Sequence, residues 1–593
     1  MRHGKHPPSF ANCRGVVLDS PLMTTRGGGD RAAPADHSGG KVAPAELVPV
    51  SCCSSFEYGL PSVGAVFCGQ QGKRNGPVAA RPSLFPTHRP CPCPSRVPAV
   101  RQQDIPDVLE RMSEMRVFSR SAVKVKATEA GERLIEEEQD TLGREPDKAA
   151  VVFDVDALRA AFAAVKQAFP PHWIHCVAIK ACPLPLVIQE AIDAGLGIEA
   201  ASFVELYMGL VQGCPANHVA FDSPAKTDEE LEMALGRGTL VNANSLGELE
   251  RIDAIIKRQG SPTTARVGIR LNPLVGAGSI AELSVSIASS KFAVPTTPAN
   301  VLAVVEAFRK WPWLVALHTH VGSQGCSLEL LANGIAALCD IADEVDGALG
   351  KGRVTLLDIG GGLPANYDSE EASPAFGEYA TVLKKNAPSL FENTERIVVT
   401  EFGKALLAKA AMTVSTVEYV RSNITEGTTS GTQKGEASAP ENISTAAGCE
   451  GELPKPSSSS SSPGYQTLVA HVGADLFLRT SYCPGKFSHR LSVHSNKGPP
   501  LGGPLMTTDV AGPLCFQGDY MARGAKIPRV APGDLLVVRD TGANTLSLFS
   551  RHCSRRSPAV YGYTRDEDGK VCVRLVREKE SVRDVARFWG VCV

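Results

Sequence analysis

A lysine and a glutamate stand at the ends of two apolar, strand-like segments of the sequence. Lys180 directly follows HCVAI, and Glu401 lies near the end of RIVVTEFG. A desolvated lysine with a lowered pKa can form a Schiff base with a carbonyl compound. The alternative for Lys180 is a surface or salt-bridge lysine, which the apolar run before it disfavours. Glu401 is suited to holding a pyridine nitrogen in its protonated form.

A run of three glycines, Gly360, Gly361 and Gly362, follows the apolar segment VTLLDI. Successive glycines allow backbone N–H groups to approach a phosphate closely. A simple turn is the alternative interpretation. The position of the run at a late strand end favours phosphate binding, because the loops after strands seven and eight are the usual phosphate site of a (β/α)8 barrel.

The segment LVALHTHVGS carries His318 and His320 two residues apart, so both lie on one face of a strand. Two such histidines suit zinc, but the sequence shows no acidic or cysteine ligand on a neighbouring strand, and we predict no metal. A lysine, a phosphate cradle, a carboxylate and an aromatic ring together indicate pyridoxal 5'-phosphate (PLP) as the cofactor.

The elements that must position these residues alternate regularly along the middle of the chain. The strand-like segments are HCVAIK (175–180), GIEAA (197–201), HVAFDS (218–223), TLVNAN (239–244), ARVGIRLNP (265–273), LVALHTHVGS (314–323), VTLLDIGGG (354–362) and RIVVTEFG (396–403). Segments of helical period separate them. Strands that alternate with helices in this way predict an α/β fold, a (β/α)8 TIM-like barrel, with a doubly wound open sheet as the alternative. A barrel places its active site at the carboxyl ends of its strands, where this sequence carries polar residues.

Composition divides the chain into three regions. Residues 1–115 are rich in Pro, Gly, Arg and Ser and predict a disordered extension, either a transit peptide or a disordered tail. Residues 116–411 predict the PLP-binding barrel with a lead-in segment. Residues 412–593 predict a mostly β domain, which a flexible, Ser-rich insertion interrupts at 422–464.

The overall composition excludes several classes of protein. The 593 residues include 61 Lys+Arg and 63 Asp+Glu, a formal net charge of -2, which argues against a nucleic-acid partner. No apolar run approaches the roughly 18 residues of a membrane helix, so we expect no membrane partner. The 17 cysteines, in a chain too large to need disulfides, indicate an intracellular protein. We expect it in the cytoplasm, or in a plastid or mitochondrion if the extension is a transit peptide.

Several motifs, in the same order along the chain, resemble those of the alanine-racemase-like (fold-type III) PLP-dependent decarboxylases. This family is the diaminopimelate/ornithine/arginine decarboxylase group, and the motifs are most like those of the diaminopimelate decarboxylases. The motifs are AIKAC, HTHVGSQ, DIGGGLP, EFGK and GPLCFQGDYMAR. The resemblance covers about residues 148–593, apart from the insertion.

The resemblance implies a role for individual residues. Lys180 and Cys515 would be catalytic, with Cys515 protonating the product carbanion across the interface of a homodimer with shared active sites. His320 would stack on the PLP ring and Ser323 would reach its phosphate. The implied cofactor-binding residues are Lys180, His320, Ser323, Gly360, Gly361, Gly362, Glu401, Gly403, Lys404 and Asn544. The implied substrate-binding residues are Lys404, Arg479, Tyr482, Phe516 and Asp519.

The sequence departs from the family's motifs at positions that recognise the substrate. Lys404 replaces an arginine and keeps its charge without its bidentate fork. Phe516 replaces a glutamate that binds the distal amine, and Asn544 replaces a tyrosine near the phosphate. LRTSY only approximates the family's LRPxLY, so Arg479 matches better than Tyr482.

The sequence therefore predicts a PLP-dependent carboxy-lyase that acts on an amino acid as its small-molecule substrate and resembles the diaminopimelate decarboxylases of lysine biosynthesis. Decarboxylation of another amino acid, such as ornithine or arginine, is one alternative. Racemisation on the same fold is a second. A catalytically weak homologue that acts by binding a partner is a third, although the retention of Lys180 and Cys515 argues against it.

Overall fold

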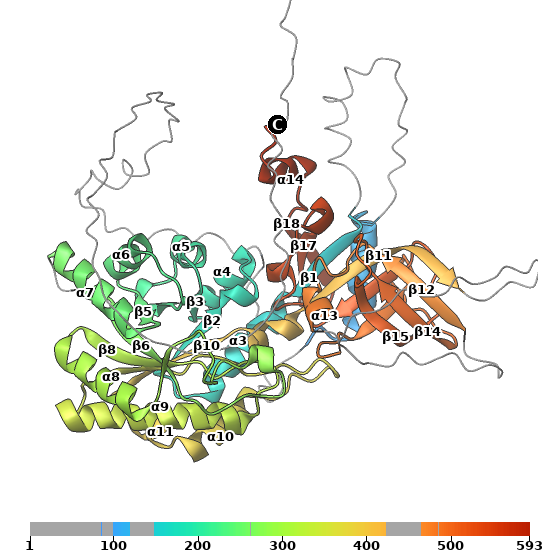
Figure 1. Cartoon of the computed structure of the whole chain (residues 1–593). Coiled ribbons are helices and arrows are strands. Elements are labelled where there is room, and N and C mark those ends of the chain that lie inside the picture. Colours follow the sequence, from blue (N-terminus) through green and yellow to red (C-terminus); the bar gives the residue numbers. More distant parts are fainter. Residues whose placement is uncertain are drawn as a thin grey trace, which may run out of the picture. The chain divides into compact units, whose positions relative to one another are not determined.

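Eight parallel strands form a closed ring in the computed structural model, which describes residues 85, 99–118, 147–260, 263–422, 464–483 and 485–592 (Figure 1). The ring is closed because β10 pairs with β2 and β5 pairs with β6. Its strands are β2 (Ile174–Ala178), β3 (Gly197–Ala200), β4 (Val219–Phe221), β5 (Leu240–Ala243), β6 (Arg266–Asn272), β8 (Leu314–Thr319), β9 (Leu356–Asp358) and β10 (Ile397–Phe402). The predicted (β/α)8 barrel is confirmed, and the pairing of β5 with β6 excludes the open doubly wound sheet.

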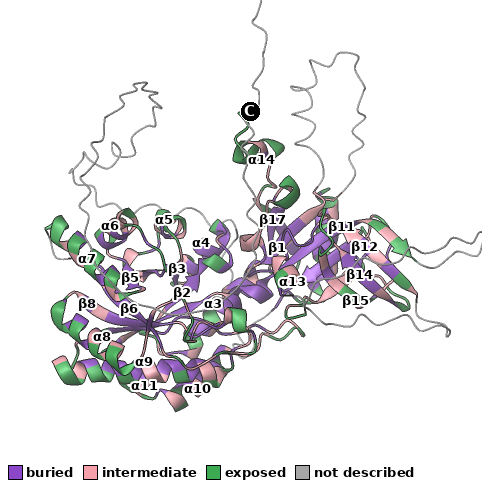
Figure 2. Ribbon diagram, in the orientation of Figure 1, coloured by how far each residue is buried: buried purple, intermediate pink, exposed green. Residues whose placement is uncertain are grey.

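Helices connect the strands and cover the outside of the ring. They are α3 (Val155–Ala168), α4 (Pro185–Asp193), α5 (Phe203–Val211), α6 (Asp228–Arg237), α7 (Leu246–Gln259), α8 (Pro298–Lys310), α9 (Leu328–Leu349), α10 (Phe376–Asn386) and the short α11 (Ser389–Glu392) and α12 (Lys404–Leu407). Ser202 and Ser245 begin α5 and α7, because each Oγ accepts a backbone N–H of the first turn. Figure 2 shows buried strands inside helices whose outer faces are exposed.

A second, nine-stranded sheet combines strands from both parts of the sequence that flank the barrel. Its strands are β1 (Ala149–Asp154), β11 (Ala411–Ser422), β12 (Tyr465–Ala470), β13 (Leu491–His494), β14 (Leu505–Ala511), β15 (Tyr520–Pro528), β16 (Leu535–Arg539), β17 (Ala559–Arg565) and β18 (Val571–Arg577). The predicted mostly β domain is confirmed. β1, which precedes the barrel in the sequence, lies between β11 and β17. The remaining elements are α13 (Leu478–Tyr482), α14 (Val582–Phe588) and the two-residue strand β7 (Val294–Pro295) beside β6.

A helix lies inside the stretch 1–115 that the sequence predicts to be disordered. Helix α1 (Asp104–Glu114) buries one apolar face against the sheet domain. The residues of this face, at helical spacing, are Ile105, Val108, Leu109 and Met112. The prediction of disorder is wrong for residues 104–114, because the pattern of one short amphipathic helix is hard to detect within a Pro- and Gly-rich region.

Other predictions for the flanking regions fall outside the described residues. These are the transit-peptide interpretation of the N-terminal extension and the flexibility of the Ser-rich insertion, of which residues 423–463 are not described. Among the described helices, none is both long enough and apolar enough to cross a membrane.

Charged residues connect the sheet domain to the barrel. Asp540, just after β16, receives two hydrogen bonds from the guanidinium of Arg490, at 3.0 and 2.8 Å. Lys409, which follows β10 and α12, lies 3.3 Å from the same carboxylate. This buried network fixes the loop after β16 against the carboxyl ends of the barrel strands.

Candidate active site

Lys180 lies in a single 3-10 turn, Ile179–Ala181, directly after β2. Its Nζ donates a 2.8 Å hydrogen bond to Oε1 of Glu199, which is fully buried on β3. The Lys180 side chain is 45% exposed, so its amine can be reached from the mouth of the barrel.

The electrostatics of Lys180 differ from the lowered pKa that the sequence led us to expect. Burial disfavours the ammonium, but attraction by Glu199, Glu401 and Asp222 outweighs it and raises the pKa of Lys180. Burial raises the pKa of Glu199 to about 7, against the opposing effect of Lys180. Glu199 is therefore placed to take the proton that Lys180 must lose before it can act as a nucleophile.

Glu401 is a buried carboxyl group without a hydrogen-bond partner among the described residues. It lies on β10, and neither of its side-chain oxygens accepts a hydrogen bond. Burial raises the pKa of Glu401 well above its usual value, and the neighbouring carboxylates of Asp358 and Glu199 add to the effect. A positively charged N–H group in front of Glu401 would satisfy it, which is the environment that a protonated pyridine nitrogen requires.

The glycine run after β9 leaves no room for side chains. A Cβ on Gly361 would lie 2.0 Å from the carbonyl oxygen of Glu401, and one on Gly362 would lie 2.2 Å from that of Gly322. Gly362 also has a φ of +97°, which other residues rarely adopt. The run therefore packs directly between β8 and β10, where its backbone can approach a ligand closely.

His320 follows β8 beside this glycine run. Its Nδ1 lies 3.3 Å from the backbone N–H of Gly361, which donates to it. Burial lowers the pKa of His320 well below its usual value, and Arg270 adds to the effect. The ring is thus neutral with its proton on Nε2, and it offers an uncharged aromatic face.

Two basic residues, Lys404 and Arg479, lie close enough for the charge of Arg479 to act on the Lys404 amine. Lys404, the first residue of α12, is buried and donates to Ser323 Oγ at 3.1 Å and to Gln324 Oε1 at 3.3 Å. Burial lowers the pKa of Lys404 to about 7, and the nearby charge of Arg479 contributes. The guanidinium of Arg479 lies over the Phe487 ring, and its buried Nε has no hydrogen-bond partner in the described part of the chain. This cation pair, Lys404 and Arg479, can bind an anion such as a phosphate or a carboxylate.

Gly403 and Asn544 lie against the turn that carries Lys180. A Cβ on Gly403 would lie 3.2 Å from the Cβ atoms of Ala178 and Ala181. The backbone N–H of Asn544 donates to the carbonyl of Ala181 at 2.7 Å. The loop after β16 therefore brings Asn544 from the sheet domain to the barrel's strand ends.

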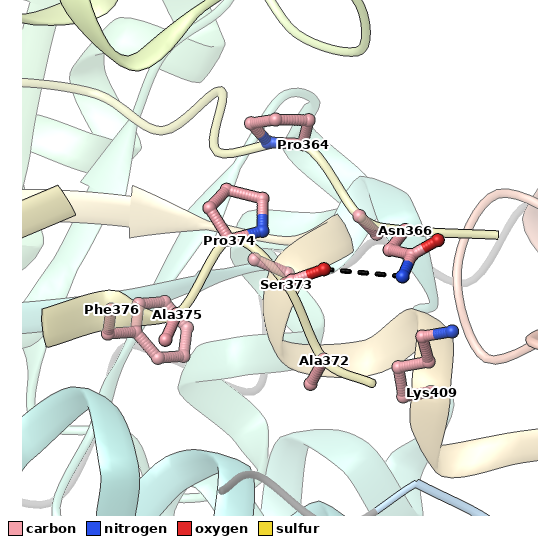
Figure 3. Close-up of a pocket in the computed structure, with 10 residues that line it drawn as sticks. Pro364, Asn366, Ala372, Ser373, Pro374, Ala375, Phe376 and Lys409 are labelled. Carbon is pink, nitrogen blue, oxygen red and sulfur yellow. Dashed lines mark hydrogen bonds between the residues drawn. The ribbon is translucent and has the colours of Figure 1, made fainter. Parts of the chain in front are cut away.

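Two pockets flank the loop that continues from the glycine run. Figure 3 shows the smaller one, where Asn366 Nδ2 donates to Ser373 Oγ at 3.2 Å and Lys409 closes one side. The wider pocket lies between this loop and the segment after α13. It is lined by Gln324, residues 364–368, Ser373, Pro374 and residues 486–488. Because Gln324 contacts Lys404, the wider pocket adjoins the cation pair.

Unlike Arg479 and Asn544, the other predicted residues of the sheet domain lie apart from this centre. Cys515 and Phe516 are exposed in the loop between β14 and β15, and Tyr482 is half exposed on α13. Within the described part of the chain, no hydrogen bond or ion pair joins residues 512–519 to the barrel. Asp519 is buried, and its carboxylate accepts the backbone N–H groups of Ala474 and Leu514 at 2.5 and 2.7 Å. Both its oxygens are thus used within the sheet domain.

Sequence reasoning did not assign a role to a layer of charged residues inside the barrel. The layer comprises Glu199, Asp222, Arg270, His318 and Asp358, all buried. Most of them stand at strand ends that the sequence already marked as polar. Glu199 could have been found as the single charge inside the apolar strand GIEA.

One part of this layer corrects the sequence argument about metal. Asp222, His318 and Glu401 present ligand atoms within 4.8 Å of one another, so acidic partners for His318 do exist, at the ends of barrel strands that do not pair with β8. However, Arg270 Nη1 already lies 3.0 Å from Asp222 Oδ2. A metal cation there would sit beside this guanidinium and near Lys180, which disfavours it electrostatically.

The residues present fit PLP. Lys180 can hold an aldehyde, the unpartnered Glu401 can pair with a ring nitrogen, and the neutral His320 offers a ring face. The side-chain-free glycine run and the Lys404–Ser323 contact suit a phosphate. A closed barrel with this arrangement at its strand ends defines the class of barrel enzymes that use PLP.

Comparison with known proteins agrees with this assignment of class. The chain matches the family model for the pyridoxal-dependent decarboxylase pyridoxal binding domain over residues 155–408, and that for the C-terminal sheet domain over residues 466–542. It belongs to the family of pyridoxal-dependent decarboxylases.

Individual relatives are distant but cover most of the chain. The diaminopimelate decarboxylase of Helicobacter pylori is 25% identical over 439 residues, which span 74% of this chain and 94% of the relative. That of Methanothermobacter thermautotrophicus is 28% identical over 406 residues, or 67% and 81% of the two chains. The crystal structure of the H. pylori enzyme complexed with L-lysine has a TM-score of 0.60 at 22% identity, covering 76% and 99%. At that identity the structure supports the fold alone.

Proposed function

We propose that the protein is a PLP-dependent decarboxylase of an amino acid with a second polar end, of the kind represented by diaminopimelate. The observation that carries the proposal is the convergence of Lys180, the unpartnered Glu401 and the glycine run at one end of the barrel. The names of the relatives support the substrate class.

Each group of the site has a separate task in this proposal. Lys180 would hold PLP covalently, after Glu199 accepts its proton. Glu401 would pair with the ring nitrogen, and His320 would lie against the ring. Bound there, PLP would supply an electron sink for the carbanion that remains when carbon dioxide leaves. The fully buried residues behind Lys180 and Glu401 would exclude water from this end of the site.

Arg479, the member of the cation pair beside the wider pocket, supports recognition of a carboxylate at the far end of the substrate. Lys404 reaches the Ser323 side of the site, while Arg479 lies toward the wider pocket next to Phe487. Release of carbon dioxide should be measured from diaminopimelate, lysine, ornithine and arginine in the presence of PLP. Turnover of none of these would contradict the proposed activity.

A homodimer with shared sites is part of the proposal. Cys515 and Phe516 are exposed, and the hydrogen bonds of their loop go to Ala474 and to Ser481 of α13. A loop of this kind is available to a second copy of the chain. In the active site of that second copy, Cys515 of the first chain would return a proton to the α-carbon of the substrate.

The pKa of Lys404 predicts how anion binding varies with pH. A bound phosphate favours the ammonium form, so binding above about pH 7 must take up a proton. Affinity is therefore expected to fall as the pH rises above 7, approaching roughly tenfold per unit. The measurement is the dissociation constant of pyridoxamine 5'-phosphate, which cannot form an imine with Lys180, between pH 7 and 9.

Lys404→Arg is the matched control, because arginine stays charged throughout this range. The titration of the ligand affects both dissociation constants equally, so it drops out of the ratio of the wild-type value to the Lys404→Arg value. This ratio should grow as the pH rises. A ratio that stays constant would remove Lys404 from the phosphate site.

Phe516 predicts weak use of diaminopimelate by the wild-type protein, because a phenyl ring cannot pair with the distal ammonium of the substrate. A hydrogen bond to a charged group contributes about 1.5–3 kcal/mol, so Phe516→Glu should raise kcat/KM for diaminopimelate by roughly 10- to 100-fold. Asp519 is poorly placed to substitute, because its oxygens accept Ala474 and Leu514 N–H groups.

Phe516→Gln is the control of similar shape without charge, and circular dichroism checks folding of both variants. Phe516 is 48% exposed, so neither change disturbs a core. Efficient wild-type turnover of diaminopimelate that Phe516→Glu leaves unimproved would show that another group binds the distal amine.

A further inference from the structure

Four carboxyl groups face the inside of the barrel, and three of them have polar partners. The partners are Lys180 Nζ for Glu199 at 2.8 Å, Arg270 Nη1 for Asp222 at 3.0 Å and Asn242 Nδ2 for Asp358 at 2.8 Å. Glu401 is the exception, since neither of its oxygens has a hydrogen-bond partner among the described residues. His318 Nε2 lies 3.7 Å from Glu401 Oε2.

His318 is fully buried on β8 between two of these carboxyl groups. Its Nδ1 lies 3.7 Å from Asp222 Oδ1, opposite the contact with Glu401. Neither ring nitrogen makes a hydrogen bond within the described part of the chain. Leaving a buried imidazole unpaired is costly, and at 3.7 Å both carboxyl oxygens lie within about half an ångström of hydrogen-bonding distance.

The charges around His318 define its protonation. Asp222 is held ionised, because the positive charges of Arg270 and Lys180 outweigh the burial that would raise its pKa. Burial lowers the pKa of His318, so the free protein carries a neutral ring. A neutral ring next to an ionised Asp222 places its single proton on Nδ1, and Nε2 is left as an acceptor toward Glu401.

We propose that His318 is the positioning residue for Glu401, an inference that rests on the proposed binding of PLP. Its Nδ1–H donates to Asp222, and its Nε2 accepts the proton of the neutral Glu401 carboxyl. When Glu401 pairs with a protonated ring nitrogen, this proton moves from Oε2 to Nε2. Glu401 is left as a carboxylate and His318 as an imidazolium that donates to both carboxylates. No proton has to leave the barrel.

The groups that face His318 and Glu401 allow this shift. They are Asp222, Asp358, Glu199, Arg270, Lys180 and His320. Three carboxyl groups stand against Arg270, Lys180 and the neutral His320, and the proton that Lys180 gives up stays nearby on Glu199. The interior can therefore accept one further positive charge once Glu401 is ionised. The imidazolium supplies that charge between the two carboxylates that it contacts.

The test compares PLP with 1-deazapyridoxal 5'-phosphate, in which a C–H group replaces the ring nitrogen. Both ligands are titrated into the full-length protein after removal of bound cofactor, and dissociation constants are measured by absorbance. If His318 acts through Glu401 on the ring nitrogen, His318→Leu weakens PLP binding by roughly 10- to 100-fold. Binding of the deaza analogue changes less than about threefold, because Glu401 has no ring nitrogen to pair with.

His175→Leu is the matched control. His175 is a second buried barrel histidine, on β2, whose Nδ1 contacts Thr400 Oγ1 at 2.8 Å. Any effect of this variant should be equal for the two ligands, and melting temperatures report the folding of both variants.

Three outcomes would overturn the inference. They are equal losses for both ligands in His318→Leu, no loss for PLP, and stoichiometric metal in the wild-type protein that His318→Leu releases. A wild-type protein that fails to bind PLP would instead contradict the proposed function itself, so the two failures are distinguishable.

Discussion

Borohydride reduction of the PLP-loaded protein is expected to leave a pyridoxyl group on Lys180 and on no other lysine. Lys180 is suited to this attachment because it follows β2 at the barrel mouth, with Glu199 at 2.8 Å to accept its proton. Peptide mapping after reduction identifies the labelled residue. Lys180→Ala should also lose the visible absorbance of the cofactor and lower kcat by roughly a thousandfold or more.

Two variants separate attachment from folding. Lys180→Arg keeps a positive charge for the Glu199 carboxylate but cannot form an imine, so we expect a folded and inactive protein. Lys226 is a buried lysine near the end of β4, and its Nζ already contacts Ser223 O, Asn242 O and Glu248. Lys226→Arg should therefore keep the label on Lys180. A label on a different lysine, or none in a protein that retains PLP, would contradict the assignment.

The sequence predicted the fold well because the barrel's signals are local. Each of the eight strands is a short, largely apolar run with polar residues at or just after its end, and the same strand ends provided Lys180, Glu401 and the glycine run. Helix α1 was not predicted, because its single apolar face is short and the residues around the helix are rich in Pro and Gly. Its partner surface lies on the sheet domain, far away in the sequence.

The electrostatics of the site could not be read from the sequence. An apolar run before Lys180 indicates burial and thus a lowered pKa, but the carboxyl groups of Glu199, Glu401 and Asp222 attract the ammonium and raise its pKa. These carboxyl groups come from other strands. His318 shows the same limit. The spacing HTH placed it beside His320, whereas its contacts are Asp222 and Glu401, on strands that precede and follow it. Contacts of this kind between side chains of distant strands depend on how the barrel strands close into a ring.

Mixing two inactive variants is expected to restore activity if the sites are shared between chains. A Lys180→Ala chain supplies Cys515, and a Cys515→Ala chain supplies Lys180. Each heterodimer then has one intact site and one doubly altered site. Heterodimers should recover about half of the wild-type activity, and a randomly reassociated mixture about a quarter.

The recovery distinguishes a shared site from one that each chain completes alone. If Cys515 reached Lys180 of its own chain, both sites of a heterodimer would be altered, and mixing would restore nothing. Two differently tagged chains allow heterodimers to be purified and verified before assay, so a failure to associate is not mistaken for a negative result. As a control, mixing Lys180→Ala with Lys180→Arg must remain inactive in either arrangement. Verified heterodimers without recovery would place the proton donor elsewhere and leave the exposed Cys515 loop with another role.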